Sequence, residues 1–172
     1  MAGLNWNDEE VAQVGEGVLS RTLPEPEWTH QAHFAALVHL LRDRPEIDLD
    51  RHLPRIIWRY NIAVGTPNNE SRGYHETITR FYLMAVRVFL ARLEDEAGPG
   101  TIVTRLVNSA FGQVGFPLRY YERDVLQSVE ARRVWVEPDL APFDFETCPM
   151  EPDDAMTDAR WKAARKAQSK PI

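Results

Sequence analysis

The spacing of hydrophobic residues along this chain predicts a series of amphipathic α-helices. In the first of them, Val11, Val14 and Val18 recur every three or four residues, which places them on one face of a helix. Asn7 and Glu10 precede them with the spacing of a helix cap. Apolar residues recur at helical spacing in four later segments, and no segment alternates in the manner of a β-strand. The five predicted helices cover residues 7–23, 26–41, 49–64, 73–96 and 102–111.

Prolines and glycines interrupt the chain after residue 112. Two short helical pieces are predicted there, near residues 118–127 and 128–135. Residues 136–145 are expected to run extended over the bundle, with their hydrophobic side chains as anchors. We therefore expect an all-α fold, a helical bundle of about five main helices with an extended, proline-containing C-terminal segment.

Length and composition favour one domain. The chain has 172 residues, of which 44% are hydrophobic and 27% are charged, as is typical of a single globular domain. We expect this single helical domain to cover residues 1–145. Residues 146–172 are expected to form a polar tail that is open to disorder, with a loose helix at 155–168.

Charge and cysteine content exclude several classes of protein. The formal net charge is −6, and no dense basic face is interleaved with aromatic residues, so nucleic-acid binding is not expected. No apolar stretch approaches the ~20 residues that span a bilayer, and the acidic N-terminus lacks the apolar core of a signal peptide. Cys148 is the only cysteine, which excludes an internal disulfide. We therefore expect a cytoplasmic protein without a membrane or nucleic-acid partner.

Three histidines occupy positions where the predicted helices are apolar. On a helical wheel of residues 27–42, His30 and His33 fall within the apolar arc. On a wheel of residues 74–95, His75 falls in the middle of the apolar side. An unsatisfied buried polar group costs roughly 1–3 kcal/mol, so each imidazole needs a partner. If the three converge, that partner is a divalent metal ion, Zn²⁺ or Fe²⁺, with His30, His33 and His75 as its ligands.

Carboxylates near these histidines are candidates for catalysis. Glu27 and His30 have the Glu-x-x-His spacing of helical metal sites, although an acid in a first helical turn is also favoured by the helix dipole. Glu76 is a candidate general base beside His75, or it forms an ion pair with Arg80 one turn later. The candidate catalytic residues are Glu76, Glu27 and Tyr74.

Four further polar residues are candidates for orienting a substrate in a mostly apolar pocket. They are Tyr60, Asn61, Arg72 and Thr79. The remaining histidines, His39 and His52, lie on polar or boundary positions of their helices and are expected at the surface.

These residues leave three hypotheses open. The leading one is a mononuclear metal-dependent enzyme of the hydrolase or transferase type, which acts on a small molecule through a metal-activated water. Two histidines and one carboxylate around Fe²⁺ would instead indicate a non-haem iron oxygenase. The third is a non-enzymatic helical module that binds a small molecule or a partner protein, with hydrogen-bonded core histidines and the acidic segment 136–159 as a surface. A homodimer is compatible with each.

Four blocks of the sequence, EWTHQAHF, RYNIAVGTPNN, GYHETITRF and WVEPDLAPF, resemble those of a small uncharacterised bacterial all-helical family. The resemblance covers about residues 26–143 and implies the helical fold but no activity. In architecture alone, the chain is also similar to DinB-like metal-binding bundles, which hold a metal through three histidines and include thiol-dependent transferases and hydrolases. The histidine spacing here departs from theirs, so the similarity implies nothing about the roles of individual residues.

Overall fold

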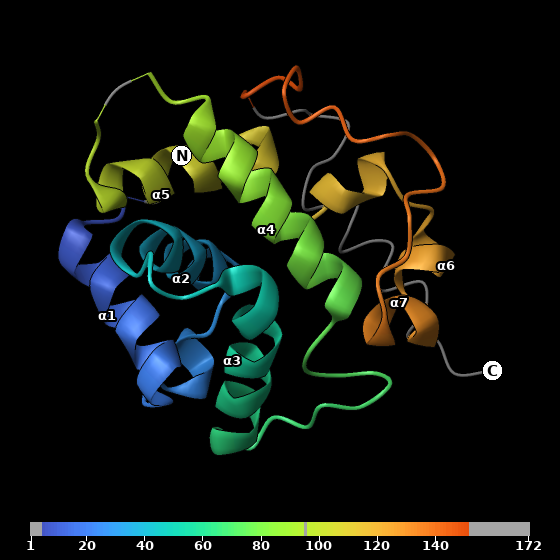
Figure 1. The fold of residues 1–172 in the computed structure, drawn as a ribbon, viewed down its shortest axis with the longest axis horizontal. Coiled ribbons are helices and arrows are strands. Elements are labelled where there is room, and N and C mark those ends of the chain that lie inside the picture. Colours follow the sequence, from blue (N-terminus) through green and yellow to red (C-terminus); the bar gives the residue numbers. More distant parts are fainter. Residues whose placement is uncertain (1–4, 95, 152–172) are drawn as a thin grey trace.

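The computed structural model describes residues 5–94 and 96–151, and this part of the chain contains helices and no strand (Figure 1). The prediction of an all-α fold is confirmed. Three single 3₁₀ turns lie at Glu25–Glu27, Ala110–Gly112 and Phe116–Arg119. The α-helices are α1 (Asp8–Ser20), α2 (His30–Asp43), α3 (Leu49–Ala63), α4 (Glu76–Ala91), α5 (Pro99–Val107), α6 (Arg123–Leu126) and α7 (Val129–Arg133).

The start of α1 is the one that its sequence predicts. The Asn7 side chain accepts a hydrogen bond from the Glu10 backbone N–H, and the Glu10 carboxylate accepts one from the Asn7 N–H, each at 2.9 Å. This reciprocal pair satisfies two backbone donors that a helix leaves without intrahelical partners at its N-terminus.

Helix α2 begins at His30, four residues after the predicted start at Pro26. Pro26 instead lies in the 3₁₀ turn that precedes the helix. The cap is Thr29, whose side chain accepts a hydrogen bond from the Ala32 N–H at 3.2 Å. His30 and His33 are therefore the first and fourth residues of α2, and their side chains lie near its N-terminal end.

Helix α4 begins at Glu76, so the prediction that its first turn includes Gly73 is wrong. Gly73 lies outside the helix with φ +79°, and a Cβ there would be 2.3 Å from the Pro67 carbonyl oxygen. The chain therefore turns tightly before α4, and His75 becomes the N-cap residue. The helix also ends at Ala91, five residues before the predicted end at Glu96.

The helices form two groups around α4. Helices α1, α2 and α5 pack against one another, and α4 packs against α2, α3 and α7. Figure 1 shows α1, α2 and α3 on one side of α4 and α6 and α7 on the other. With 16 residues α4 is the longest helix described, and none of the described helices has the length and apolar character needed to cross a membrane.

The face of α4 that is turned to the C-terminal half is covered by an aromatic cluster. Phe81 of α4 is fully buried, and its ring centroid lies 5.3–5.7 Å from those of Phe116, Tyr120, Phe143 and Phe145. Residues 136–145 contain no helix, and two of these rings anchor them to the bundle. This is the extended segment with hydrophobic anchors that the sequence predicts.

Packing continues beyond the expected domain end at residue 145. Cys148 is fully buried, and the Arg92 guanidinium donates to the carbonyl oxygens of Phe145 and Cys148 at 2.8 Å. The Met150 carbonyl accepts a hydrogen bond from the Ala110 N–H at 3.1 Å. The first residues of the predicted tail therefore belong to the packed domain, whereas the loose helix predicted at 155–168 lies outside the described residues.

Candidate functional site

A cavity of about 430 Å³ lies between helices α1, α2, α3 and α4. Its walls are mostly aliphatic and aromatic, and its few polar groups come from two histidines, a threonine and a tyrosine. Helices α1 to α4 all contribute. The lining residues are Val18, Trp28, His30, His33, Phe34, Ala36, Leu37, Leu40, Leu53, Ile57, Ile78, Thr79, Tyr82 and Val114.

His30 is tied to the turn that follows α5. Its Nε2 lies 2.9 Å from the Gly112 carbonyl oxygen, and because a carbonyl only accepts, Nε2 carries the proton. The ring also makes edge contacts with Phe34 and Tyr82, at centroid distances of 4.9 and 5.9 Å. A Cβ at Gly112 would lie 2.4 Å from the Leu106 carbonyl oxygen, so this turn requires glycine to bring its carbonyl to His30.

The second ring nitrogen of His33 has no hydrogen-bond partner in the described part of the chain. Its Nδ1 lies 2.5 Å from the Thr29 carbonyl oxygen, one turn back along α2, so Nδ1 carries the proton. The ring stacks on Trp28 at a centroid distance of 3.8 Å. Nε2 has no hydrogen bond to any described residue and is not among the buried unsatisfied atoms, so a ligand or water can reach it.

The state of His33 at neutral pH follows from its surroundings. Burial lowers the pKa of His33 to about 4, against a smaller opposing contribution from the Thr29 carbonyl. The imidazole is therefore neutral at pH 7, with Nδ1 protonated and a lone pair on Nε2. His33 offers the cavity a hydrogen-bond acceptor.

His75 does not join the other two histidines. As the N-cap of α4, its Nδ1 accepts a hydrogen bond from the Ile78 N–H at 3.3 Å. Its Nε2 donates to the Leu126 carbonyl oxygen at 2.9 Å. Burial lowers its pKa to about 4, so it too is neutral at pH 7. Both ring nitrogens are occupied, which leaves no lone pair for a metal ion.

The convergence of His30, His33 and His75 expected from the sequence is not found. Each imidazole is bound to a different backbone carbonyl, on Gly112, Thr29 and Leu126. Among the residues that the structure describes, no group of three or more His, Cys, Asp or Glu side chains is placed to hold a metal ion. These residues therefore do not fit a Zn²⁺ or Fe²⁺ centre of the expected kind.

The candidate catalytic residues also lie apart from the cavity. Glu27 is exposed in the 3₁₀ turn before α2. Glu76 accepts hydrogen bonds from Arg80 and, at 2.6 Å, from the Tyr74 hydroxyl, so the ion-pair alternative for Glu76 is present. Burial and the neighbouring Glu76 raise the pKa of Tyr74, which keeps its hydroxyl protonated as a donor.

Of the four candidate substrate-binding residues, only Thr79 lines the cavity. The buried Tyr60 hydroxyl donates to the Leu23 carbonyl oxygen at 3.0 Å. The Asn61 side chain holds the loop between α3 and α4 by donating to Asn68 at 2.8 Å, and Arg72 is exposed in that loop. Tyr60 and Asn61 are therefore packing residues in this structure.

His39 is buried, contrary to its predicted surface position, whereas His52 is exposed as predicted. Nδ1 of His39 lies 3.0 Å from Asp43 and Nε2 lies 2.8 Å from Glu16. The histidine thus links α1 to α2 by contacting two carboxylates. A Cβ at Gly15 would be only 2.2 Å from the His39 ring, so a glycine at this position of α1 is what allows the ring to pack.

Sequence reasoning missed two residues of the cavity wall, Trp28 and Tyr82. Trp28 falls on the polar side of the helical wheel, but it precedes α2 and is free of the helical register. The Tyr82 hydroxyl donates to the Gln113 carbonyl at 3.3 Å. An aromatic residue near the interior face of α4 was a usable signal for Tyr82, whereas no pattern in the sequence indicates Trp28.

Comparisons with protein-family models, with curated proteins and with solved structures found no match to this chain. The resemblance to a bacterial helical family therefore stays a prediction, and function is inferred from the residues of this chain alone.

Proposed function

We propose that this protein binds a small, mostly apolar molecule in the cavity that helices α1, α2, α3 and α4 enclose. The ligand carries one hydrogen-bond donor, a hydroxyl or an N–H, which it donates to Nε2 of His33. The observation that carries the proposal is a reachable imidazole acceptor in a mostly apolar cavity of about 430 Å³.

The size and walls of the cavity support a small-molecule ligand. Small-molecule sites in proteins enclose about 300–1,000 Å³ and are apolar with a few placed polar groups. Here the walls come from Leu37, Leu40, Ile57 and similar apolar residues, which bury the apolar surface of a ligand without fixing its orientation. His33 and Thr79 supply the polar contacts that orient a ligand.

The ionisation of His33 favours binding over proton transfer. A general base works best when its pKa lies near the operating pH. A histidine with a pKa of about 4 is a weak base at pH 7, but it remains a good hydrogen-bond acceptor. We therefore favour the binding-module hypothesis over the hydrolase, transferase and oxygenase hypotheses, each of which needs a metal site. The cytoplasmic location and the homodimer stay predictions.

Filling the cavity is expected to abolish binding. Ile57 lines the cavity from α3, and Ile57→Trp places a larger side chain in the space that the ligand needs. Ile62, on the same helix, is 62% exposed and lies outside the cavity, so Ile62→Trp is the matched control. We expect 1-naphthol, titrated by calorimetry at pH 7, to bind wild type and Ile62→Trp equally and Ile57→Trp at least tenfold more weakly.

Two results of that titration would refute the proposal. One is the absence of 1-naphthol binding to wild type, together with an absence of binding by other small phenols. The other is equal binding by wild type and an Ile57→Trp variant that retains its helical circular dichroism, because the ligand would then occupy another place.

A further inference from the structure

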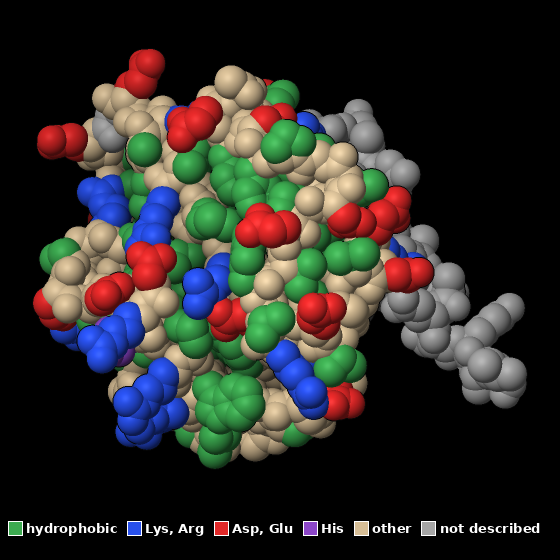
Figure 2. Space-filling model, turned by 45° about the vertical axis from the view of Figure 1, so that its right-hand side comes forward, with side chains coloured by type: hydrophobic (Ala, Val, Ile, Leu, Met, Phe, Trp, Pro, Cys, Tyr) green, Lys and Arg blue, Asp and Glu red, His purple; other side chains and the backbone are tan. Residues whose placement is uncertain are grey.

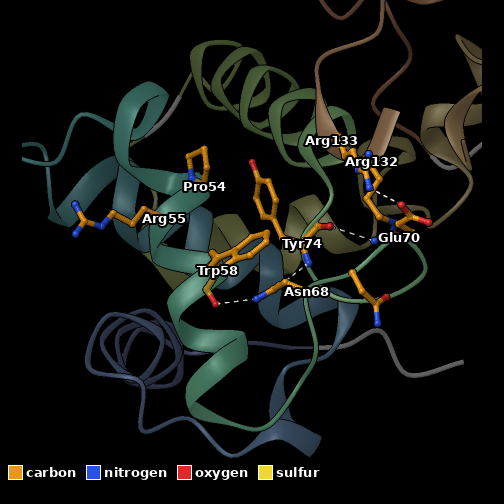
Figure 3. A pocket seen from close by; sticks show the side chains of 9 residues that line it. Pro54, Arg55, Trp58, Asn68, Glu70, Tyr74, Arg132 and Arg133 are labelled. Carbon is orange, nitrogen blue, oxygen red and sulfur yellow. Dashed lines mark hydrogen bonds and ion pairs between the residues drawn. The ribbon is translucent and has the colours of Figure 1, made fainter. Parts of the chain in front are cut away.

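A second hollow, a groove of about 690 Å³, lies on the other side of α3. It is formed by α3, the loop of residues 64–75 and α7 (Figure 3). Unlike the cavity, it combines aromatic and basic side chains. The lining residues are Pro54, Arg55, Trp58, Asn68, Asn69, Glu70, Tyr74, Arg132 and Arg133.

The loop that forms the floor of the groove is held by Asn68. Its side-chain oxygen accepts hydrogen bonds from Asn61 Nδ2 at 2.8 Å and from the Tyr74 N–H at 2.9 Å. Its Nδ2 donates to the Trp58 carbonyl oxygen at 3.1 Å. Two of these bonds fasten the loop to α3 and the third joins its two ends, so the groove is formed before any ligand arrives.

Arg132 brings a guanidinium without a carboxylate partner to this groove. Its Nη1 donates to the carbonyl oxygens of Gly73 and Tyr74, at 3.3 and 3.1 Å. No acidic side chain of the described residues pairs with it, and burial alone lowers its pKa. Its Nε is buried without a hydrogen-bond partner. The second terminal nitrogen, Nη2, makes no hydrogen bond to a described residue and is not among the buried unpaired atoms, so it is the donor that a ligand in the groove can reach.

An aromatic wall stands next to this charge. Trp58 is 45% exposed although its indole is large and apolar. Its ring centroid lies 6.3 Å from that of Tyr74, with an angle of 61° between the planes, and Figure 3 shows the two rings side by side. An exposed indole face beside a second aromatic ring offers a stacking surface for a planar ligand.

The groove is lined by three arginines and only one acidic residue. Glu70 pairs with Arg133 (Figure 3), which leaves Arg132 and Arg55 as positive charges without a described acidic partner. Figure 2 shows hydrophobic side chains at the lower end of this face, where α3 and α7 lie, with basic side chains on both sides. Charge and shape thus favour an anion that also carries an apolar plane.

We propose that this groove is a second ligand site, which binds a planar aromatic carboxylate. The carboxylate accepts a charge-assisted hydrogen bond from Nη2 of Arg132, the donor that the Gly73 and Tyr74 carbonyls leave unused. The ring packs against Trp58 and Tyr74. This site is separate from the histidine-lined cavity, and it does not depend on whether that cavity binds a ligand.

The test compares three probes on the wild-type protein by calorimetry. 2-Naphthoate carries the ring and the charge, 2-naphthamide carries the ring alone, and acetate carries the charge alone. We expect 2-naphthoate to bind at least about tenfold more tightly than either control compound. Equal binding of 2-naphthoate and 2-naphthamide would overturn the proposal, as would the absence of 2-naphthoate binding.

Variants then locate the bound probe. Trp58→Leu, at an exposed position that tolerates substitution, and Arg132→Gln are each expected to weaken 2-naphthoate binding by about tenfold or more. Arg51→Gln, which removes an exposed arginine of α3 outside the groove, is expected to leave it within about twofold. Loss of binding in Ile57→Trp with no loss in Trp58→Leu would assign the probe to the cavity and overturn the proposal.

Discussion

Replacing Phe81 by alanine is expected to lower the free energy of unfolding by about 3–5 kcal/mol, the usual cost of removing a buried phenylalanine ring. Phe81 is fully buried, and its ring is surrounded by other aromatic rings, among them those of Phe116, Tyr120, Phe143 and Phe145. Two of them, Phe143 and Phe145, belong to the extended C-terminal segment. The substitution therefore leaves a hole between α4 and that segment, and the segment loses its main anchor. Urea denaturation followed by circular dichroism measures the effect.

Phe81→Leu is the matched variant, because leucine keeps much of the apolar volume. It is expected to cost about 1–2 kcal/mol, well below the alanine variant. A loss of less than about 1 kcal/mol in Phe81→Ala would mean that the aromatic cluster does not hold the C-terminal segment to the bundle.

Replacing His75 by alanine is expected to cost about 2–4 kcal/mol at pH 7. The substitution removes the N-cap of α4, which contributes about 0.5–2 kcal/mol. It also leaves the buried Leu126 carbonyl oxygen without its donor, which costs about 1–3 kcal/mol. His75→Asn restores a side-chain cap acceptor for the Ile78 N–H and is expected to recover about 1 kcal/mol. Urea denaturation at pH 7 compares the two variants with wild type.

The same variants test the ionisation of His75. Its pKa is about 4 in the folded protein and about 6.5 in the unfolded chain. The unfolded chain therefore binds more protons between these values, and stability is complete above pH 6.5 and falls as the pH falls from 6.5 to 4. For His75 the loss from pH 7 to pH 5 is about 2 kcal/mol.

Asparagine does not titrate, so the stability deficit of His75→Asn relative to wild type is expected to shrink by about 2 kcal/mol between pH 7 and pH 5. An unchanged deficit would mean that His75 is not held in its neutral form. It would argue against the pair of hydrogen bonds that excludes this residue from a metal site.

Periodicity predicted the helices well, because each main helix buries one continuous apolar face. It failed to predict where individual helices begin and end, because capping side chains and tight turns set those positions. His75 looked like an interior position because the wheel extended the helix back to Tyr74, whereas the turn at Gly73 makes it the cap. His39 looked like a surface residue because a wheel cannot show that α1, through Gly15, covers the polar side of α2.

The candidate site was predictable to the same extent. His30 and His33 face the interior as their wheel positions indicate, and both line the cavity together with Thr79. Their partners were not predictable, because the carbonyl that holds His30 belongs to Gly112, 82 residues away. The sequence pattern of His30, His33 and His75 therefore suggested one shared metal ion, whereas in the fold each imidazole is hydrogen-bonded to a different backbone carbonyl.

The most direct test of the account observes the ring nitrogens of His33 by long-range ¹H–¹⁵N NMR at pH 7. We predict a neutral imidazole with the proton on Nδ1, and a shift of the Nε2 resonance when 1-naphthol is added but not when naphthalene is added. The resonances of His75 should stay in place. A Nε2 signal that 1-naphthol leaves unchanged at saturation, or a proton found on Nε2 instead of Nδ1, would contradict the proposal that His33 is the acceptor for a bound ligand.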